Sequence, residues 1–220
     1  MPEGLEVFIL SKALKELGFD CESHGKHLLI KDFYSGKMYD VSFGLAGKIF
    51  IDNDNMNIKK VVKEDVPCGD MKIINSFEEA KENLGVDWVK ASKEDIEYVI
   101  NSKWKDRKKQ IGALLLEQNE LCGIGVAWAS EILYYANIHP SEKANTLEFL
   151  GVDKNLIESI ILVRDFMLKK YLQSIKINSK KFVNEWFENL YSVREKYLKV
   201  YRKDSAKEIK ISGRSFYASN

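Results

Sequence analysis

The stretch from Gly123 to Ala136, GIGVAWASEILYYA, decides how the second half of this chain is interpreted. Its apolar residues recur with the period of an α-helix, which predicts a helix over roughly 126–136. The two glycines before that helix interrupt the preceding segment. A helix N-terminus can face a phosphate, because its backbone N–H groups and the helix dipole both favour an anion. The stretch is therefore a candidate contact for a polyanion.

Helical patterns continue on both sides of this stretch. Ser92 is a good N-cap for one helix, and Arg107–Gln118 predicts a second. Pro140 then interrupts the pattern, and two or three further helices are expected within 141–193. We therefore expect residues 91–196 to form a helical domain.

The first 90 residues follow a different pattern. Residues 4–17 predict a helix that Gly18 ends. Ser76 and Glu79 have the spacing of a capping box and predict the start of a short helix. Between these helices, short β-branched or alternating segments predict strands. The expected strands are His27–Phe33, Lys37–Phe43 and Lys48–Ile51, and more weakly Met56–Val62 and Met71–Asn75. Residues 1–90 are thus expected to form a small, β-sandwich-like domain with an N-terminal helix.

The last residues alternate again, which predicts a terminal β-hairpin within 197–220 that turns near Asp204–Lys207. Aromatic side chains at Tyr201, Phe216 and Tyr217 are expected to pack this hairpin. Together with the two preceding domains, it predicts an α+β fold.

Charge is distributed unevenly along the chain, although the net charge of the 220 residues is only +1. Residues 161–220 carry +8 and the first 160 carry −7. This asymmetry favours a polyanion as partner of the C-terminal part, and a solvated basic helix face is the alternative. No apolar run is long enough to span a bilayer and no targeting signal opens the chain, so a cytoplasmic, nucleoid-associated protein is expected.

Cys21, Cys68 and Cys122 are isolated and are interpreted as plain buried residues. Neither they nor the three histidines have the close spacing of a structural zinc site. We expect no metal, no cofactor and no disulfide.

Pro2 and Glu3 are the candidates for chemistry. Once Met1 is removed, Pro2 has a secondary amine that titrates within about two pH units of neutrality and is nucleophilic when uncharged. Its attack on C1′ of a nucleotide would expel the base and leave an iminium ion. A carboxylic acid at Glu3 can protonate the sugar ring oxygen during this attack. Met-Pro starts are also common in inert proteins, and Glu3 also suits a helix N-terminus.

Three separated segments together resemble the formamidopyrimidine-DNA glycosylase/endonuclease VIII family. They are the start MPEGLEV, the stretch from Gly123 with IHP at 138–140, and SGRSFY at 212–217. In that family the middle segment is a helix–two-turn–helix, and the last is one strand of a finger. The resemblance implies that Pro2 is the nucleophile and Glu3 the acid. Glu6 matches a further family glutamate, interpreted as a positioning or helix residue. No cysteine flanks the last segment, which resembles the zincless form of the finger.

The resemblance implies further site residues. Lys26, at the start of a strand, matches a phosphate-contacting lysine, although an edge-strand lysine can also simply limit aggregation. Leu45 takes the place of an apolar residue that fills the stack when a damaged nucleotide is flipped out, and a core leucine is the alternative. Arg214 matches the finger arginine of the minor groove. An exposed hairpin arginine is its alternative.

Other expected DNA contacts lie around the helix–two-turn–helix. Gly123 and Gly125 would present backbone N–H groups to a phosphate. The family usually has asparagine after the second glycine, whereas this chain has Val126, which removes one phosphate ligand. We expect basic residues upstream to compensate, and Lys203 of the hairpin to contribute charge. These upstream residues are Lys103, Lys105, Arg107, Lys108 and Lys109.

The resemblance implies base-excision repair by a monomeric glycosylase and abasic-site lyase that acts on damaged DNA. The sequence has no counterpart of the family's extra strands between Gly18 and Lys26, nor of its arginine–phenylalanine loop. Residues 190–213 also lack the long loop that caps oxidised guanine in some members. These features favour the endonuclease VIII branch, which removes oxidised pyrimidines and ring-opened bases. A DNA-binding protein that has lost catalysis is the main alternative, and an RNA- or ribosome-associated protein is a third.

Overall fold

The computed structural model describes residues 2–32, 34–44, 48–51, 58–61, 69–174 and 180–219. Contacts divide the chain into two compact units. The first unit contains residues 1–84 and 168–195, and the second contains 85–167 and 196–220. The α+β class expected from the sequence is confirmed, since both units combine helices with strands.

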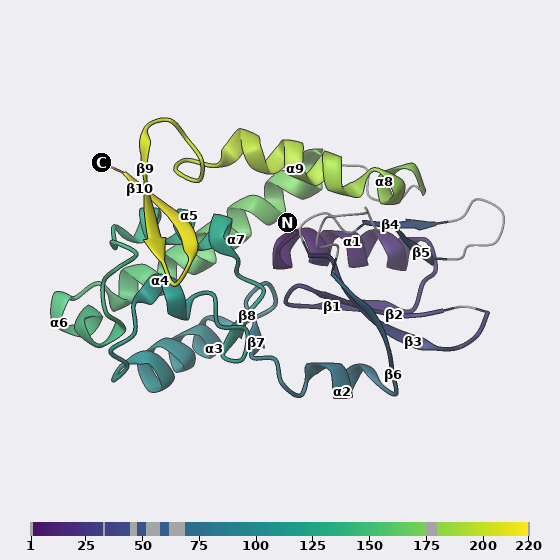
Figure 1. Cartoon of the computed structure of the whole chain (residues 1–220), viewed down its shortest axis with the longest axis horizontal. Helices are drawn as coiled ribbons and strands as arrows, with labels where there is room; N and C mark the ends of the chain where they lie inside the picture. Colours follow the sequence, from purple (N-terminus) through teal and green to yellow (C-terminus); the bar gives the residue numbers. More distant parts are fainter. Residues whose placement is uncertain are drawn as a thin grey trace. The chain divides into compact units, whose positions relative to one another are not determined.

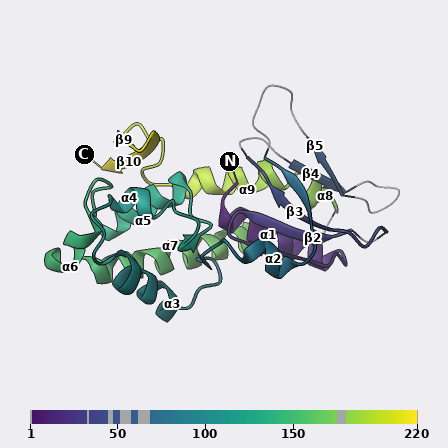
Figure 2. The same ribbon diagram turned by 60° about the horizontal axis from the view of Figure 1, so that its bottom comes forward.

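The first unit is built around an antiparallel sheet with the strand order β1-β2-β3-β6. Helix α1 packs on β1 and β2, and within the part of the chain that the structure describes β4 pairs with β5 in a separate two-stranded sheet (Figures 1 and 2). The elements are α1 (Gly4–Glu16), β1 (Cys21–His24), β2 (His27–Lys31), β3 (Met38–Ser42), β4 (Lys48–Ile51), β5 (Ile58–Val61), β6 (Met71–Ile74), α2 (Phe77–Lys81) and α8 (Lys180–Asn184).

Helix α1 forms where the apolar periodicity predicts it. Leu10, Ala13 and Leu14 are fully buried, so the predicted apolar face is the face in the core. The helix ends at Glu16, and Gly18 follows with a φ of +89°, a left-handed conformation that glycine adopts without steric cost. The predicted N-terminus of α2 is also confirmed, because the Ser76 side chain accepts a hydrogen bond from the Glu79 N–H.

The expectation that no strand lies between Gly18 and Lys26 is wrong, because β1 forms there. It forms a hairpin with β2 in which His24 is opposite His27, so the turn consists of Gly25 and Lys26 alone. Cys21 and Ser23 are the buried positions of this strand. The strand escaped prediction because CESH contains no Val, Ile, Thr, Phe, Tyr or Trp, and its stability comes from pairing with β2 and packing on α1.

The second unit is mainly helical. Its elements are β7 (Val86–Asp87), α3 (Lys93–Tyr98), the π-helix η1 (Val99–Trp104), α4 (Ile111–Leu114), β8 (Leu121–Cys122), α5 (Val126–Ala136), the 3₁₀ helix η2 (Ala144–Thr146), α6 (Leu147–Leu150), β9 (Ala206–Ile211) and β10 (Arg214–Ser219). Helix α5 has the predicted bounds, and Ser92 caps α3 as expected. Two long helices, α7 (Asp153–Ser174) and α9 (Trp186–Tyr197), run from one contact unit into the other along the chain.

The predicted helix over Arg107–Gln118 is wrong, because only α4 is helical there. Backbone groups of this segment bond to residues 140–145 instead. Ile111 N donates to the Glu142 carbonyl at 2.7 Å, and Gly112 N donates to the Pro140 carbonyl at 3.0 Å. Tertiary hydrogen bonds thus outweigh the local helical propensity of the segment.

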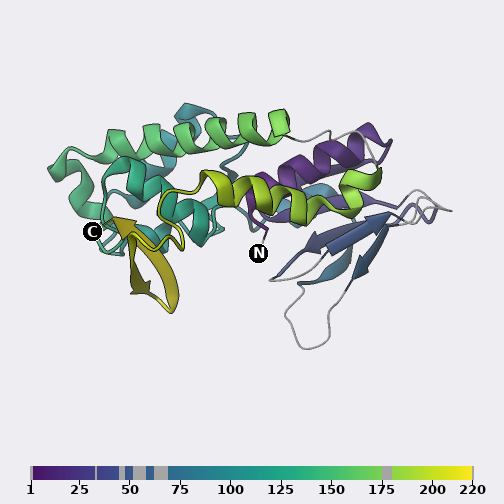
Figure 3. The ribbon, with the colours of Figure 1, turned by 90° about the horizontal axis from the view of Figure 1, so that it is seen from above.

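The terminal hairpin exists, but its turn is not at Asp204–Lys207. Ile211 pairs with Arg214, so the turn consists of Ser212 and Gly213, with φ of +48° and +75°. Two positive φ values are those of the tight turn that matches the twist of a hairpin. Figure 3 shows the two strands (yellow) side by side.

Packing of the hairpin follows the prediction. Phe216 is fully buried, and the rings of Tyr201 and Tyr217 meet edge to face with centroids 5.2 Å apart. The Tyr217 N–H donates to the Ser130 hydroxyl of α5 at 3.1 Å, so the hairpin is fixed to the helix it lies against (Figure 1).

The two units do not coincide with the three domains predicted from the sequence, which were 1–90, 91–196 and 197–220. Residues 168–195 belong with the N-terminal unit, to which they contribute buried side chains such as Tyr171, Trp186 and Leu190. The hairpin belongs to the same unit as α5.

Cys21 and Cys122 are buried free thiols, as expected, and Cys68 lies outside the described residues. Burial raises the pKa of Cys21 to about 12. Among the described residues, no cluster of His, Cys, Asp and Glu could hold a metal ion. No described helix is long and apolar enough to cross a membrane.

Candidate functional site

Pro2 and Glu3 lie at the start of α1 and are both buried. Glu3 is the N-cap residue of the helix and forms a capping box with Glu6. The Glu6 carboxylate accepts the Glu3 N–H at 3.0 Å. The alternative interpretation of Glu3, an acid that favours a helix N-terminus, is therefore correct, and it leaves the proposed acid role open. The peptide between Pro2 and Glu3 is held at a defined place.

Glu6 has two further partners from distant parts of the first unit. The Tyr171 hydroxyl of α7 donates to Glu6 Oε1 at 2.7 Å, and Arg194 Nη1 of α9 lies 3.4 Å from the same oxygen. All three side chains are almost completely buried. Sequence reasoning found Glu6 but missed its partners, since they are 165 and 188 residues away.

The protonation states of this cluster follow from its charges. Burial, and then the negative charge of Glu6, raise the pKa of Tyr171 well above its usual value, so the phenol keeps its proton and donates. Burial alone would lower the pKa of Arg194, but the charges of Glu6 and Glu3 outweigh it and raise this pKa above its usual value. The cluster therefore contains a buried, fully charged arginine beside two carboxylic side chains.

Lys26 lies in the two-residue turn before β2, half-buried, rather than within the strand itself. Its neighbour His27 contacts Asp40 of β3, with Nδ1 and Oδ1 2.7 Å apart. The hairpin fixes the position of Lys26 on the backbone, as a phosphate contact requires. Leu45, the expected void-filling residue, lies outside the described residues.

In the second unit, the glycine loop before α5 has the geometry the sequence predicts. Gly123 has a φ of +97°, and Gly125 is the N-cap of α5 without a side-chain cap. Gln118 orders the loop, because its Oε1 accepts the Gly123 N–H at 2.9 Å and its Nε2 donates to the Ile124 carbonyl at 3.1 Å. Sequence reasoning missed Gln118, whose role depends on the turn after α4.

The basic residues upstream of the loop are mostly neutralised within the second unit. Lys105 pairs with Glu148 at 2.9 Å, Lys109 with Glu117, and Arg107 with both Glu117 and Glu120. Lys108 has no hydrogen-bond or ion-pair partner among the described residues. Within the ranges that the structure describes, Lys103 forms no ion pair either and only lies over the Tyr98 ring, with Nζ 5.9 Å from the centroid. Lys103 and Lys108 are therefore placed to meet a phosphate without breaking an ion pair.

Arg214 is the first residue of β10 and is exposed directly after the tight turn. In the described part of the chain its guanidinium has neither a hydrogen-bond nor an ion-pair partner. Lys203 precedes β9 and is partly exposed. The hairpin thus presents Arg214 at its tip on a rigid, well-packed support.

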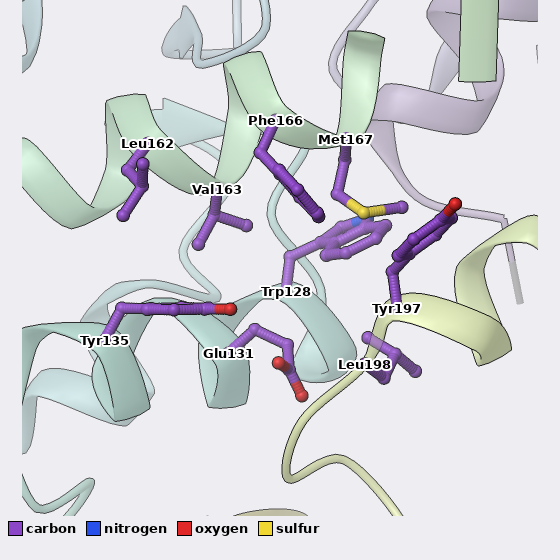
Figure 4. Close-up of a pocket in the computed structure, with 9 residues that line it drawn as sticks. All are labelled: Trp128, Glu131, Tyr135, Leu162, Val163, Phe166, Met167, Tyr197 and Leu198. Carbon is purple, nitrogen blue, oxygen red and sulfur yellow. The ribbon is translucent and has the colours of Figure 1, made fainter. Parts of the chain in front are cut away.

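Glu131 is a buried acid within the apolar helix α5, and it holds the segment that leads into the hairpin. Oε2 accepts the Lys199 N–H at 2.8 Å, and Oε1 accepts those of Val200 and Tyr201 at 2.9 Å each. Figure 4 shows its carboxylate beside an apolar pocket of about 220 Å³. None of the predicted site residues lines this pocket. A lone glutamate in a helix as apolar as α5 is the signal that could have identified it.

Comparisons with known proteins agree with this geometry. The family model for the formamidopyrimidine-DNA glycosylase H2TH domain matches residues 84–170. A formamidopyrimidine-DNA glycosylase from Rickettsia conorii is 27% identical over 97% of this chain and 84% of its own length. One from Thermomicrobium roseum is 38% identical, over 26% of this chain and 19% of its own length.

Solved structures share the fold. A complex of wild-type Lactococcus lactis Fpg (MutM) with DNA containing N7-benzyl-Fapy-dG superposes with a TM-score of 0.66 at 19% identity, and the match covers 99% of this chain and 97% of that one. MutM in complex with DNA containing carbocyclic 8-oxo-G gives a TM-score of 0.65 at 18% identity, with 99% and 98% covered. The fold of these two structures therefore matches that of this protein over almost its whole length.

Proposed function

We propose that this chain is a member of the formamidopyrimidine-DNA glycosylase/endonuclease VIII family, and that it acts as a monomeric, bifunctional DNA glycosylase and abasic-site lyase of base-excision repair. Pro2 is its nucleophile and Glu3 its general acid. The observation that carries the proposal is the buried Pro2-Glu3 start, held by Glu6 in a chain that also matches the H2TH family model.

The proposed chemistry begins when the uncharged Pro2 nitrogen forms a bond to C1′ of the damaged nucleotide and the bond from C1′ to the base breaks, with the amine's N–H proton passing to the departing base. Glu3 gives a proton to the sugar ring oxygen, the ring opens, and an iminium ion remains. The iminium draws electrons from C2′, which loses a proton, and the 3′ phosphate leaves. A second elimination releases the 5′ phosphate, and water then frees the amine.

DNA binding would use both units. In the second unit, backbone N–H groups at Gly123 and Gly125 and the side chain of Lys108 meet phosphates, and Lys203 adds charge. Arg214 reaches the minor groove beside the lesion, and Lys26 of the first unit contacts a phosphate. Leu45 would fill the space of the flipped nucleotide. Lys105 and Lys109 already form ion pairs with glutamates. To bind DNA, each would have to leave its glutamate carboxylate for a phosphate.

The substrates we propose are oxidised pyrimidines and ring-opened bases. The segment that follows α9 supports this, because it runs directly into β9 and leaves no room in the sequence for a long capping loop. Excision of an oxidised pyrimidine is expected to be faster than excision of 8-oxoguanine from otherwise identical duplexes.

Glu3→Gln tests the assignment. Glutamine keeps the shape of the side chain but cannot donate a carboxylic proton, so base excision should fall by roughly 100-fold or more. Cleavage of a preformed abasic site should fall much less, since the ring-opened aldehyde there needs no such acid. Incision gels on both substrates measure the two rates. Equal losses on both would contradict the role of Glu3, and no activity of the unaltered protein on either would favour a binding protein without catalysis.

A further inference from the structure

The cluster around Glu6 contains more than a helix cap requires. A capping box is complete with two reciprocal bonds, from the N3 N–H to the N-cap side chain and from the N-cap N–H to the N3 side chain, and both are present here. Here Glu6 is 3% exposed and also binds Tyr171 and Arg194. A buried ion pair is weak evidence for stability, since apolar residues of similar volume often stabilise a fold as well. The network therefore calls for another explanation.

The two carboxylate oxygens of Glu6 face different partners. Oε1 binds the Tyr171 hydroxyl and Arg194, and Oε2 accepts the Glu3 N–H. Because two helices fix one oxygen, the other cannot swing away from Glu3. The Glu3 nitrogen is three covalent bonds from the Pro2 nitrogen. Holding this N–H therefore restricts the rotation that aims the Pro2 amine.

Charge gives the network a second effect on the amine. Carboxylates close to an amine favour its protonated form, which is not a nucleophile. Arg194 places a buried positive charge against Glu6 and offsets that effect. Arg194 also stacks on the Tyr191 ring, with its guanidinium carbon 4.8 Å from the centroid, which holds the guanidinium in place.

The other charged and titratable groups near Glu6 come from its own helix and from the elements packed on α1. Glu3 lies on α1, Glu195 follows Arg194 on α9, and α8 contributes the exposed Lys181. The strands packed on α1 carry Glu22, His24, His27 and Lys31. Of these, Glu3 is the residue joined to Pro2, so the balance between Glu3, Glu6 and Arg194 decides the charge beside the amine.

We propose that Tyr171 and Arg194 are positioning residues for the Pro2 amine, which fix Glu6 against the Glu3 N–H and balance the negative charge beside the nucleophile. This inference rests on the proposed function only in taking the Pro2 amine to be the nucleophile. Neither residue touches the nucleotide.

The test measures the amine itself, without DNA. Protein that has lost Met1 is prepared with isotope-labelled proline, and the Pro2 signal is followed by NMR through a pH titration. The chain has only three prolines, so the signals separate readily. Arg194→Met should raise the pKa of the Pro2 amine by about one pH unit. Near neutrality, the uncharged fraction of the amine should then be roughly a tenth of that in the unaltered protein. Tyr171→Phe, which removes a single oxygen, should raise it by less.

Lys12→Met is the matched control, because it removes one exposed positive charge from α1 and should leave the amine unchanged. Arg194→Lys keeps the positive charge beside Glu6, so the amine pKa should stay close to that of the unaltered protein. It should hold the Glu6 carboxylate in place less firmly than arginine does. Folding of each variant is checked by thermal unfolding, and if Arg194→Met does not fold, Tyr171→Phe decides. Folded Arg194→Met and Tyr171→Phe variants with the amine pKa of the unaltered protein would overturn the inference. A shifted amine in a protein that never cleaves DNA would instead refute the proposed function and leave the network intact.

Discussion

Glu131→Gln is expected to loosen the connection between α9 and the terminal hairpin. In the structure, one buried carboxylate accepts three consecutive backbone N–H groups from Lys199, Val200 and Tyr201. Glutamine keeps the shape of the side chain but has one acceptor oxygen. If that oxygen remains with Val200 and Tyr201, the amide NH₂ faces the Lys199 N–H, and two donors oppose each other.

The magnitude follows from the bonds that change. A hydrogen bond to a charged group contributes about 1.5–3 kcal/mol, and a buried donor left without an acceptor costs about 1–3 kcal/mol. In the variant, the hydrogen bond from the Lys199 N–H is lost, and those from Val200 and Tyr201 go to an uncharged amide oxygen in place of a carboxylate. We therefore expect the free energy of unfolding to fall by about 3 kcal/mol. This corresponds to roughly a 100-fold change in the equilibrium for opening the segment.

Two measurements check this prediction. Urea denaturation gives the change in the free energy of unfolding, and hydrogen exchange gives the protection of the amides of residues 199–201. Glu142→Gln is the control, because Glu142 is an exposed acid of the same unit whose side chain has no partner among the described residues. If Glu131→Gln matches this control in both stability and exchange, the carboxylate does not hold the hairpin and the reasoning is wrong.

Two further predictions concern the second unit. Gly85→Ala should destabilise the protein by more than about 3 kcal/mol, since an added Cβ would lie 2.2 Å from the Glu120 backbone. Gly36→Ala, in the first unit, meets no atom within 4 Å and should cost only the roughly 1 kcal/mol strain of a side chain at its φ of +65°. Thermal unfolding of both variants distinguishes them, and similar midpoints would refute the close approach. Arg214→Ala should weaken binding to lesion-bearing duplexes by about 1–3 kcal/mol, while Lys203→Ala should weaken binding to all duplexes and flatten its salt dependence. Titrations at two salt concentrations compare them, and identical behaviour would mean that the hairpin is only a basic patch.

Local patterns in the sequence predicted the elements whose stability is local. Helices α1 and α5 have strong apolar periodicity and glycines at their ends, and both form within a residue of their predicted bounds. Strand β1 and the short helix α4 were predicted incorrectly for different reasons. Strand β1 was missed because its residues have low strand propensity, although its partner β2 follows after a two-residue turn. Helix α4 is shorter than predicted because the backbone around it bonds to residues 140–145, far along the chain.

The same distinction applies to the site. Pro2, Glu3, Gly123 and Arg214 belong to short motifs, so the sequence could nominate them as candidates. Tyr171 and Arg194 could not, because an arginine in a helical pattern carries no sign that it will be buried against a glutamate near the N-terminus. Tertiary structure alone brings these residues together.

The central claim is that the free amine of Pro2 attacks C1′. Borohydride reduction during reaction with an abasic oligonucleotide would convert the iminium ion to a stable amine link between protein and DNA. Mass spectrometry of the proteolysed complex then locates the attachment. The account predicts one adduct, on the Pro2 nitrogen, and none in protein whose N-terminus is blocked by an extra tag. An adduct on a lysine, or strand cleavage undiminished by the tag, would contradict it.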